Sequence, residues 1–223
     1  MSRVTESAAE RSVRIPAGAA VLNGDLAIPA GAAGIVIFAH GTGSSRKSSR
    51  NRHVASVLNE AGLATLLMDL LTAEEEVVDL RTAELRFDIP FLAQRVLHAT
   101  DFVRQDAQTR NLRIGYFGAS TGAGAALIAA AQRPRDVHAV VSRGGRPDLA
   151  AEHLARVQAP TLLIVGANDR PVIGMNQDAL RQLHAPARLE IVPGATHLFE
   201  EPGTLEQAAR LARDWFGKYL RAA

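Results

Sequence analysis

The sequence of 223 residues contains no cysteine, and aromatic residues make up only 4% of it. The lack of cysteine excludes disulfide bonds, thiolate metal sites, iron–sulfur clusters and a cysteine nucleophile. Net charge is small as well, because 25 basic residues face 23 acidic ones and leave a formal charge of +2. Proteins that bind nucleic acids usually have a concentrated basic face with aromatic stacking platforms, so we expect no nucleic-acid partner.

Long hydrophobic runs are also missing. The longest apolar runs, such as residues 35–39, are too short to cross a bilayer, so no membrane association is expected. Residues 1–20 contain no apolar stretch that resembles the core of a signal peptide. With the absence of cysteine, this predicts a cytoplasmic protein. A chain of 223 residues with 47% hydrophobic residues suits one compact domain over residues 1–223.

Short β-branched runs alternate with stretches of helical composition along most of the chain. The runs predict strands over residues 34–38, 64–68, 112–117, 137–142, 160–165 and 188–192. The stretches between them predict helices over about residues 51–61, 87–105, 121–132, 177–183 and 205–220. This alternation predicts an α/β fold with a mostly parallel sheet and helices on both faces. The first 30 residues, with turn signals between short extended pieces, predict an antiparallel hairpin at one sheet edge.

Ligands of open parallel sheets bind beyond the carboxyl ends of the strands, where this sequence places a serine, a carboxylate and an imidazole. Residues 118–122 read Gly-Ala-Ser-Thr-Gly and fit the G-x-S-x-G pattern. They close a predicted strand and open a predicted helix, the context in which this pattern exposes a serine on a sharp turn. An ordinary N-cap serine is the alternative. The strand–turn–helix context favours Ser120 as a nucleophile.

A serine nucleophile needs a base, and the base needs an acid to orient it. In the chain order typical of this architecture, the acid and then the histidine follow the serine. His197 comes directly after a predicted strand, whereas His153 lies in a helical stretch and His184 ends a helix. Asp169 follows another strand and is the predicted acid, although it could be a turn aspartate. Asp148, after the preceding strand, is the competing acid.

Acyl transfer also requires donors for the oxyanion that forms on the substrate carbonyl. The usual donors are the backbone N–H of the residue after the nucleophile and one from the loop after an earlier strand. These positions predict Thr121 and Thr42, and Gly41 would let the loop backbone approach the substrate. No acid–base partner is implied for His40 by chain order, so we expect His40 to be structural.

The His40–Gly41 loop, the Ser120 elbow, Asp169 and His197 resemble the α/β-hydrolase fold, and within it the chain is similar to the dienelactone hydrolase family over nearly its whole length. The stretches PTLLIVGANDRPV and LEIVPGATHLFEEPG resemble the acid and histidine segments of that family. The resemblance implies hydrolysis of carboxylic esters or lactones through a Ser-His-Asp triad and an acyl-enzyme, without a metal or an organic cofactor. Dienelactone hydrolases proper have a cysteine at the elbow and a glutamate near the oxyanion loop, where this chain has Ser120 and His40-Gly41-Thr42-Gly43.

Two further features bear on the substrate. Only about 18 residues separate Ser142 from Pro160, which leaves room for a loop and one short helix, so no cap domain is expected and an open site would favour small or flexible esters.

Arg143 directly follows a predicted strand, and Arg46 follows the oxyanion loop. A guanidinium can hold a carboxylate in bidentate fashion, so these arginines are candidates for binding an anionic substrate. The alternative is that they pair with nearby acids, such as Asp69 or Glu74.

Other functions stay open at this stage. A dinucleotide site is disfavoured because neither residues 41–46 nor residues 122–124 continue to the third glycine of the G-x-G-x-x-G fingerprint. A non-catalytic or acyltransferase member of the same fold is the main alternative, since fold does not determine function. The acidic run at Glu74, Glu75 and Glu76, within the irregular residues 70–86, predicts a solvated loop or the start of a helix.

Overall fold

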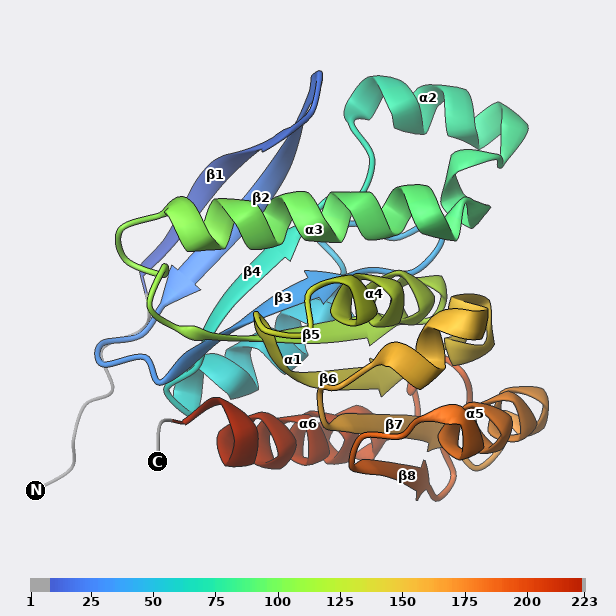
Figure 1. Cartoon of the computed structure of the whole chain (residues 1–223). Helices are drawn as coiled ribbons and strands as arrows, with labels where there is room; N and C mark the ends of the chain where they lie inside the picture. The colour runs from blue at the N-terminus through green and yellow to red at the C-terminus, as the bar shows by residue number, and fades with distance from the viewer. Residues whose placement is uncertain (1–8, 222–223) are drawn as a thin grey trace, which may run out of the picture.

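The computed structural model describes residues 9–221, and its eight strands form one sheet in the order β1-β2-β4-β3-β5-β6-β7-β8 (Figure 1). The strands are β1 (Ala9–Ala17), β2 (Ala20–Ile28), β3 (Gly34–Ala39), β4 (Ala64–Met68), β5 (Arg113–Ala119), β6 (Val137–Arg143), β7 (Thr161–Gly166) and β8 (Ala187–Val192). Strands β3 to β8 pair in parallel, while β1 and β2 form an antiparallel hairpin that joins the sheet edge at β4. The predicted mostly parallel sheet with an antiparallel edge hairpin is confirmed.

Helices cover both faces of the sheet. They are α1 (Ser49–Glu60), α2 (Ala73–Thr82), α3 (Ile89–Gln105), α4 (Thr121–Gln132), α5 (Arg170–Gln182) and α6 (Thr204–Leu220), with the 3₁₀ helices η1 (Leu85–Phe87) and η2 (Pro147–Arg156). One apolar core forms where α3, α4, α5 and η2 pack on the sheet, and a second forms under α1 and α6 on the opposite face. In Figure 1, α3 and α4 lie in front of the sheet and α1 lies behind it.

The central strands are apolar along their whole length because both of their faces are covered. All six residues of β3 and all five of β4 are buried. Such strands read as continuous hydrophobic runs rather than as alternating patterns, which explains why they stand out in the sequence. The polar residues that follow them are thereby brought to one edge of the sheet.

The start of one helix differs from the sequence expectation, and the acidic run adopts one of its two expected structures. Helix α5 begins at Arg170, seven residues earlier than expected, because Pro171 fits the first turn of a helix. The acidic run becomes the first turn of α2, where the side chain of Thr72 accepts from the N–H of Glu75 and the carboxylate of Glu75 accepts from the N–H of Thr72. In Figure 1, α2 lies apart from the sheet, above the right-hand half of α3.

The connection from β6 to β7 contains only η2, so residues 9–221 include no cap domain there. Within the same residues, every helix is too short or too polar to span a bilayer. The expectation of no leader over residues 1–20 falls in part on residues 1–8, which lie outside the described residues.

Candidate active site

Ser120 sits on a strained turn between β5 and α4. Its backbone has φ 50° and ψ −123°, a conformation that non-glycine residues rarely adopt and that surrounding structure must enforce. The enforcement comes from close packing, since a Cβ on Gly122 would lie 2.2 Å from the carbonyl oxygen of Ala39 and 2.4 Å from that of His40. Glycine at position 122 therefore lets α4 begin directly against the end of β3, which holds Ser120 at the carboxyl edge of the sheet.

His197 and Asp169 form a hydrogen-bonded chain with Ser120. Nε2 of His197 lies 3.3 Å from Oγ of Ser120, and Nδ1 lies 2.6 Å from Oδ2 of Asp169. The carboxylate accepts, so Nδ1 carries the proton and Nε2 is left to accept from the serine hydroxyl. Asp169 comes from the end of β7 and His197 from the segment after β8. The side chain of His197 is 39% exposed, so a substrate in solution can reach it.

The competing candidates lie elsewhere. Asp148 pairs with the Arg146 guanidinium, whose Nε donates to Oδ1 at 2.9 Å, and this contact raises the pKa of Arg146. His153 has Nδ1 3.1 Å from the carbonyl oxygen of Ala150, one turn away in η2. Of the predicted histidines, the structure thus places His197 in contact with Ser120, and of the predicted acids it places Asp169 in contact with His197.

The two threonines predicted to supply the oxyanion donors touch each other. The N–H of Thr42 donates to Oγ1 of Thr121 at 3.0 Å, and the two threonine Oγ1 atoms lie 3.0 Å apart. The loop that carries Thr42 is pressed onto the nucleophile, because a Cβ on Gly41 would lie 2.9 Å from Cβ of Ser120. The backbone at Thr42 and the first turn of α4 therefore meet beside Ser120.

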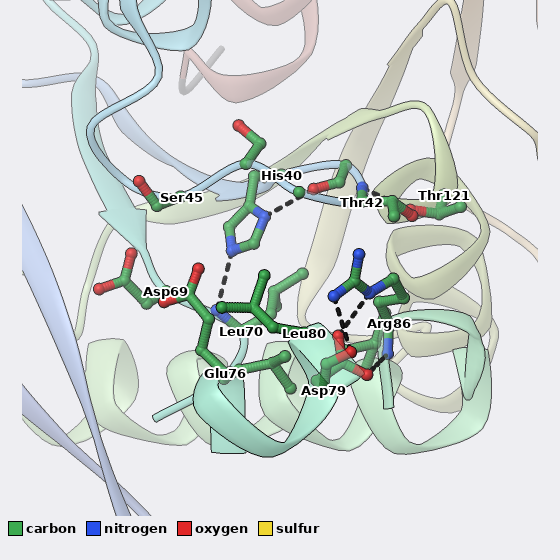
Figure 2. Close-up of a pocket in the computed structure, with 15 residues that line it drawn as sticks. His40, Thr42, Ser45, Asp69, Leu70, Glu76, Asp79, Leu80, Arg86 and Thr121 are labelled. Carbon is green, nitrogen blue, oxygen red and sulfur yellow. Dashed lines mark hydrogen bonds and ion pairs between the residues drawn. The ribbon is translucent and has the colours of Figure 1, made fainter. Parts of the chain in front are cut away.

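His40 connects this loop to the segment after β4, as Figure 2 shows. The N–H of Leu70 donates to Nε2 at 3.0 Å, and Nδ1 lies 2.9 Å from the carbonyl oxygen of Gly41. The residue as a whole is 9% exposed. Burial lowers the pKa of His40, although the carboxylates of Asp69 and Glu76 oppose that effect.

A cavity of about 110 Å³ lies between the loop of residues 40–45 and α2 (Figure 2). Its walls include Thr42 and Thr121, and four leucines supply apolar surface: Leu70, Leu71, Leu80 and Leu92. The sequence analysis did not identify α2 as a wall of this cavity. The signal available was the capping-box pattern of a threonine followed three residues later by a glutamate, which marks a helix start.

The arginines differ in their partners. Arg46 forms an ion pair with Asp69, and its Nε lies 3.5 Å from Oδ2 of Asp25. Arg143 is only 7% exposed, its Nη1 has no hydrogen-bond partner, and its guanidinium lies 5.9 Å from the ring centres of Phe117 and Phe199. Burial, with a smaller contribution from Arg50, lowers the pKa of Arg143 to about 10. Residues 9–221 contain no group of three or more histidine and carboxylate side chains placed to hold a metal ion.

Known proteins are similar to this chain in sequence and in fold. The sequence model described as "Dienelactone hydrolase family" matches residues 22–220. A crystal structure named as a dienelactone hydrolase from Anabaena variabilis ATCC 29413 is 61% identical, with a TM-score of 0.95 over 97% of this chain and 100% of that one. Est1E from Butyrivibrio proteoclasticus is 16% identical, with a TM-score of 0.78 over 93% of this chain and 98% of that one, a likeness of fold alone.

Curated relatives are longer than this chain. A Mycobacterium tuberculosis protein of strain H37Rv, provisionally named as a phosphoribosyl transferase, is 55% identical over 211 residues. These residues are 95% of this chain but only 47% of the relative, so the chain spans about half the length of the curated relatives that it matches.

Proposed function

The chain belongs to the dienelactone hydrolase family, and we propose that it is a serine hydrolase that cleaves carboxylic ester or lactone bonds through an acyl-enzyme. The observation that carries the proposal is the chain of contacts from Ser120 through His197 to Asp169, set on a strained turn. A serine hydroxyl is a weak nucleophile at neutral pH and becomes effective when an oriented imidazole takes its proton.

Each of the three residues then has a defined role in the hydrolysis of an ester. His197 Nε2 accepts the proton as Ser120 Oγ forms a bond to the substrate carbonyl carbon. The same proton passes to the leaving alcohol oxygen as the carbon–oxygen bond breaks. Water repeats the sequence on the acyl-enzyme, which releases the acid and restores Ser120. Asp169 keeps His197 in the required tautomer and stabilises its positive charge during transfer.

The backbone N–H groups of Thr42 and Thr121 are proposed to stabilise the oxyanion. Thr42 N–H donates to the Thr121 hydroxyl in this structure. Substrate binding must therefore turn that hydroxyl aside, or the hydroxyl must itself donate to the oxyanion. The cavity is lined by both threonines but by neither Ser120 nor His197, and the leaving alcohol has to lie at His197 to receive its proton. We therefore assign the cavity to the acyl part of the substrate.

Two experiments test the proposal against the alternatives of a non-catalytic or acyltransferase protein. An activated alkyl phosphonate should label Ser120, and mass spectrometry of peptides should locate the adduct. A panel of nitrophenyl esters and lactones should be hydrolysed, with short acyl groups preferred because the cavity is small. Absence of both labelling and turnover would overturn the proposal, and ester formation with an added alcohol in preference to hydrolysis would identify a transferase.

The transferase name of the mycobacterial relatives applies to proteins about twice as long as the matched part. The proposal for this chain rests on its serine site, which lies wholly within residues 22–220, the range that the family model matches.

A further inference from the structure

We propose that His40 is a positioning residue for the acyl-transfer step, because it orients the peptide unit between Gly41 and Thr42, whose N–H is the proposed oxyanion donor. This inference rests on the proposed chemistry at Ser120. Chain order alone predicts only a structural role for this buried histidine, and the proposal adds an effect on catalysis.

The peptide unit that joins Gly41 to Thr42 is held at both ends. A peptide is planar, with its C=O and N–H pointing in opposite directions, so fixing the oxygen also fixes the direction of the N–H. The oxygen of Gly41 lies 2.9 Å from Nδ1 of His40 and also accepts from the N–H of Ser44 at 3.2 Å. At the other end, the N–H of Thr42 points to the N-terminus of α4, where it donates to Oγ1 of Thr121.

The tautomer of His40 is determined by a different part of the chain. The N–H of Leu70 can only donate, so Nε2, at 3.0 Å from it, must be unprotonated. The one proton of the neutral ring therefore resides on Nδ1, which donates to Gly41. Leu70 belongs to the connection between β4 and α2, the same connection that forms the cavity wall (Figure 2). The ring of His40 thus connects the segment that lines the acyl cavity to the peptide unit that carries the N–H of Thr42.

The surroundings of His40 suit a neutral ring. The charged groups that face it are Asp69 at the end of β4 and Glu76 on α2, and their attraction for a proton is outweighed by burial. A second ring proton would point at the N–H of Leu70 and break that hydrogen bond, because two donors cannot share it.

Two substitutions separate the contacts of the ring. The side-chain amide of asparagine reaches about as far as Nδ1, so His40→Asn can still donate to Gly41 but loses Leu70. The amide oxygen of glutamine reaches about as far as Nε2, so His40→Gln can still accept from Leu70 but loses Gly41. Removing an oxyanion donor costs about a hundredfold or more, and because Ser44 still holds Gly41, we expect His40→Gln to lower kcat by about tenfold with little change in KM.

The same ratio should appear in the rate constant for labelling of Ser120 by an alkyl phosphonate, and His40→Asn, which keeps the contact with Gly41, should lose less of both rates than His40→Gln does. His138→Gln is the matched control. His138 makes the same kind of contact, with Nδ1 2.9 Å from the carbonyl oxygen of Asp136, but lies at the far end of β6 from Ser120. It should lower thermal stability without lowering kcat.

Nitrogen-15 spectra of the imidazole test the proposal without activity. The ring of His40 should show the Nδ1-protonated neutral tautomer between about pH 6 and pH 8. The opposite tautomer, a charged ring, or wild-type kcat in His40→Gln would overturn the role of His40. Equal losses in both variants that follow their thermal stability would also overturn it. A wild-type protein that neither hydrolyses esters nor reacts with the phosphonate would instead overturn the proposed function.

Discussion

Asp169 Oδ2 lies 2.6 Å from Nδ1 of His197, although the two residues are 28 positions apart. The contact joins the end of β7 to the segment after β8, two adjacent parallel strands. It also explains why the Asp169 side chain makes no capping hydrogen bond to α5, which begins at the next residue. A carboxylate that could satisfy a helix end is instead directed to an imidazole.

This contact predicts that Asp169→Asn lowers kcat by about a hundredfold or more, because the amide favours the wrong tautomer of His197. Asp148→Asn should leave kcat nearly unchanged, since Asp148 pairs with Arg146 instead. Steady-state assays of both purified variants with one nitrophenyl ester make the comparison. The reverse pattern would transfer the role to Asp148.

Removal of the nucleophile should abolish turnover without unfolding the protein. We expect Ser120→Ala to lose at least about a thousandfold in kcat, because the remaining hydrogen-bond donors cannot replace the covalent step. Circular dichroism should show an unchanged fold. An Ser120→Ala protein that is folded and still has near-native esterase activity would contradict the assignment.

The packing of the elbow predicts a loss of stability in Gly122→Ala. The added Cβ would lie 2.2 Å from the backbone oxygen of Ala39, which cannot move without shifting β3. We expect a decrease in the free energy of unfolding of about 3 kcal/mol, measured by urea denaturation. Gly174→Ala in α5 is the control, because its Cβ meets no atom within 4 Å and alanine favours a helix by about 0.5–1 kcal/mol. Destabilisation by Gly174→Ala equal to that by Gly122→Ala would contradict the steric explanation.

The unpaired guanidinium of Arg143 predicts a preference for anionic substrates. An ester with a free carboxylate should be cleaved with higher kcat/KM than its methyl diester, because Arg143 is a buried cation that has no carboxylate partner among residues 9–221 and could bind the added charge. Arg143→Gln should erase this preference, and Arg146→Gln, whose guanidinium pairs with Asp148, should keep it. Equal kcat/KM for both substrates in the wild type would leave Arg143 with a structural role only.

His40, which is buried, and His138, which is partly buried, predict a pH dependence of stability. Burial holds the pKa of His40 and of His138 below the ordinary value of 6.5 in the folded protein. The unfolded chain therefore binds protons more readily at these rings, and the free energy of unfolding should fall as the pH drops below about 6.5. Above that pH both rings are neutral in both states and contribute no further change. Urea denaturation at several pH values should show a shallower dependence for His138→Gln, and an identical dependence would exclude His138 as a contributor.

The order of elements was predictable because hydrophobic runs mark buried strands. The start of β3 and both ends of β4 match the expected residues, since both strands are enclosed by helices. The start of α5 was not predictable in the same way, because a turn aspartate before Arg170 and Pro171 reads equally well as a loop. The acidic first turn of α2 had the same ambiguity, and only its capping contacts with Thr72 decide it.

The sequence by itself determined the strand-end positions of Ser120, Asp169 and His197, because parallel strands bring their carboxyl ends to one edge and local patterns mark where each strand stops. Which of Asp169 and Asp148 contacts His197, which way the His40 ring points, and that Arg143 Nη1 has no partner within residues 9–221 were decided only by the tertiary structure. Each depends on which side chain faces which across the sheet, and such contacts join residues far apart in the chain through packing that no local pattern records.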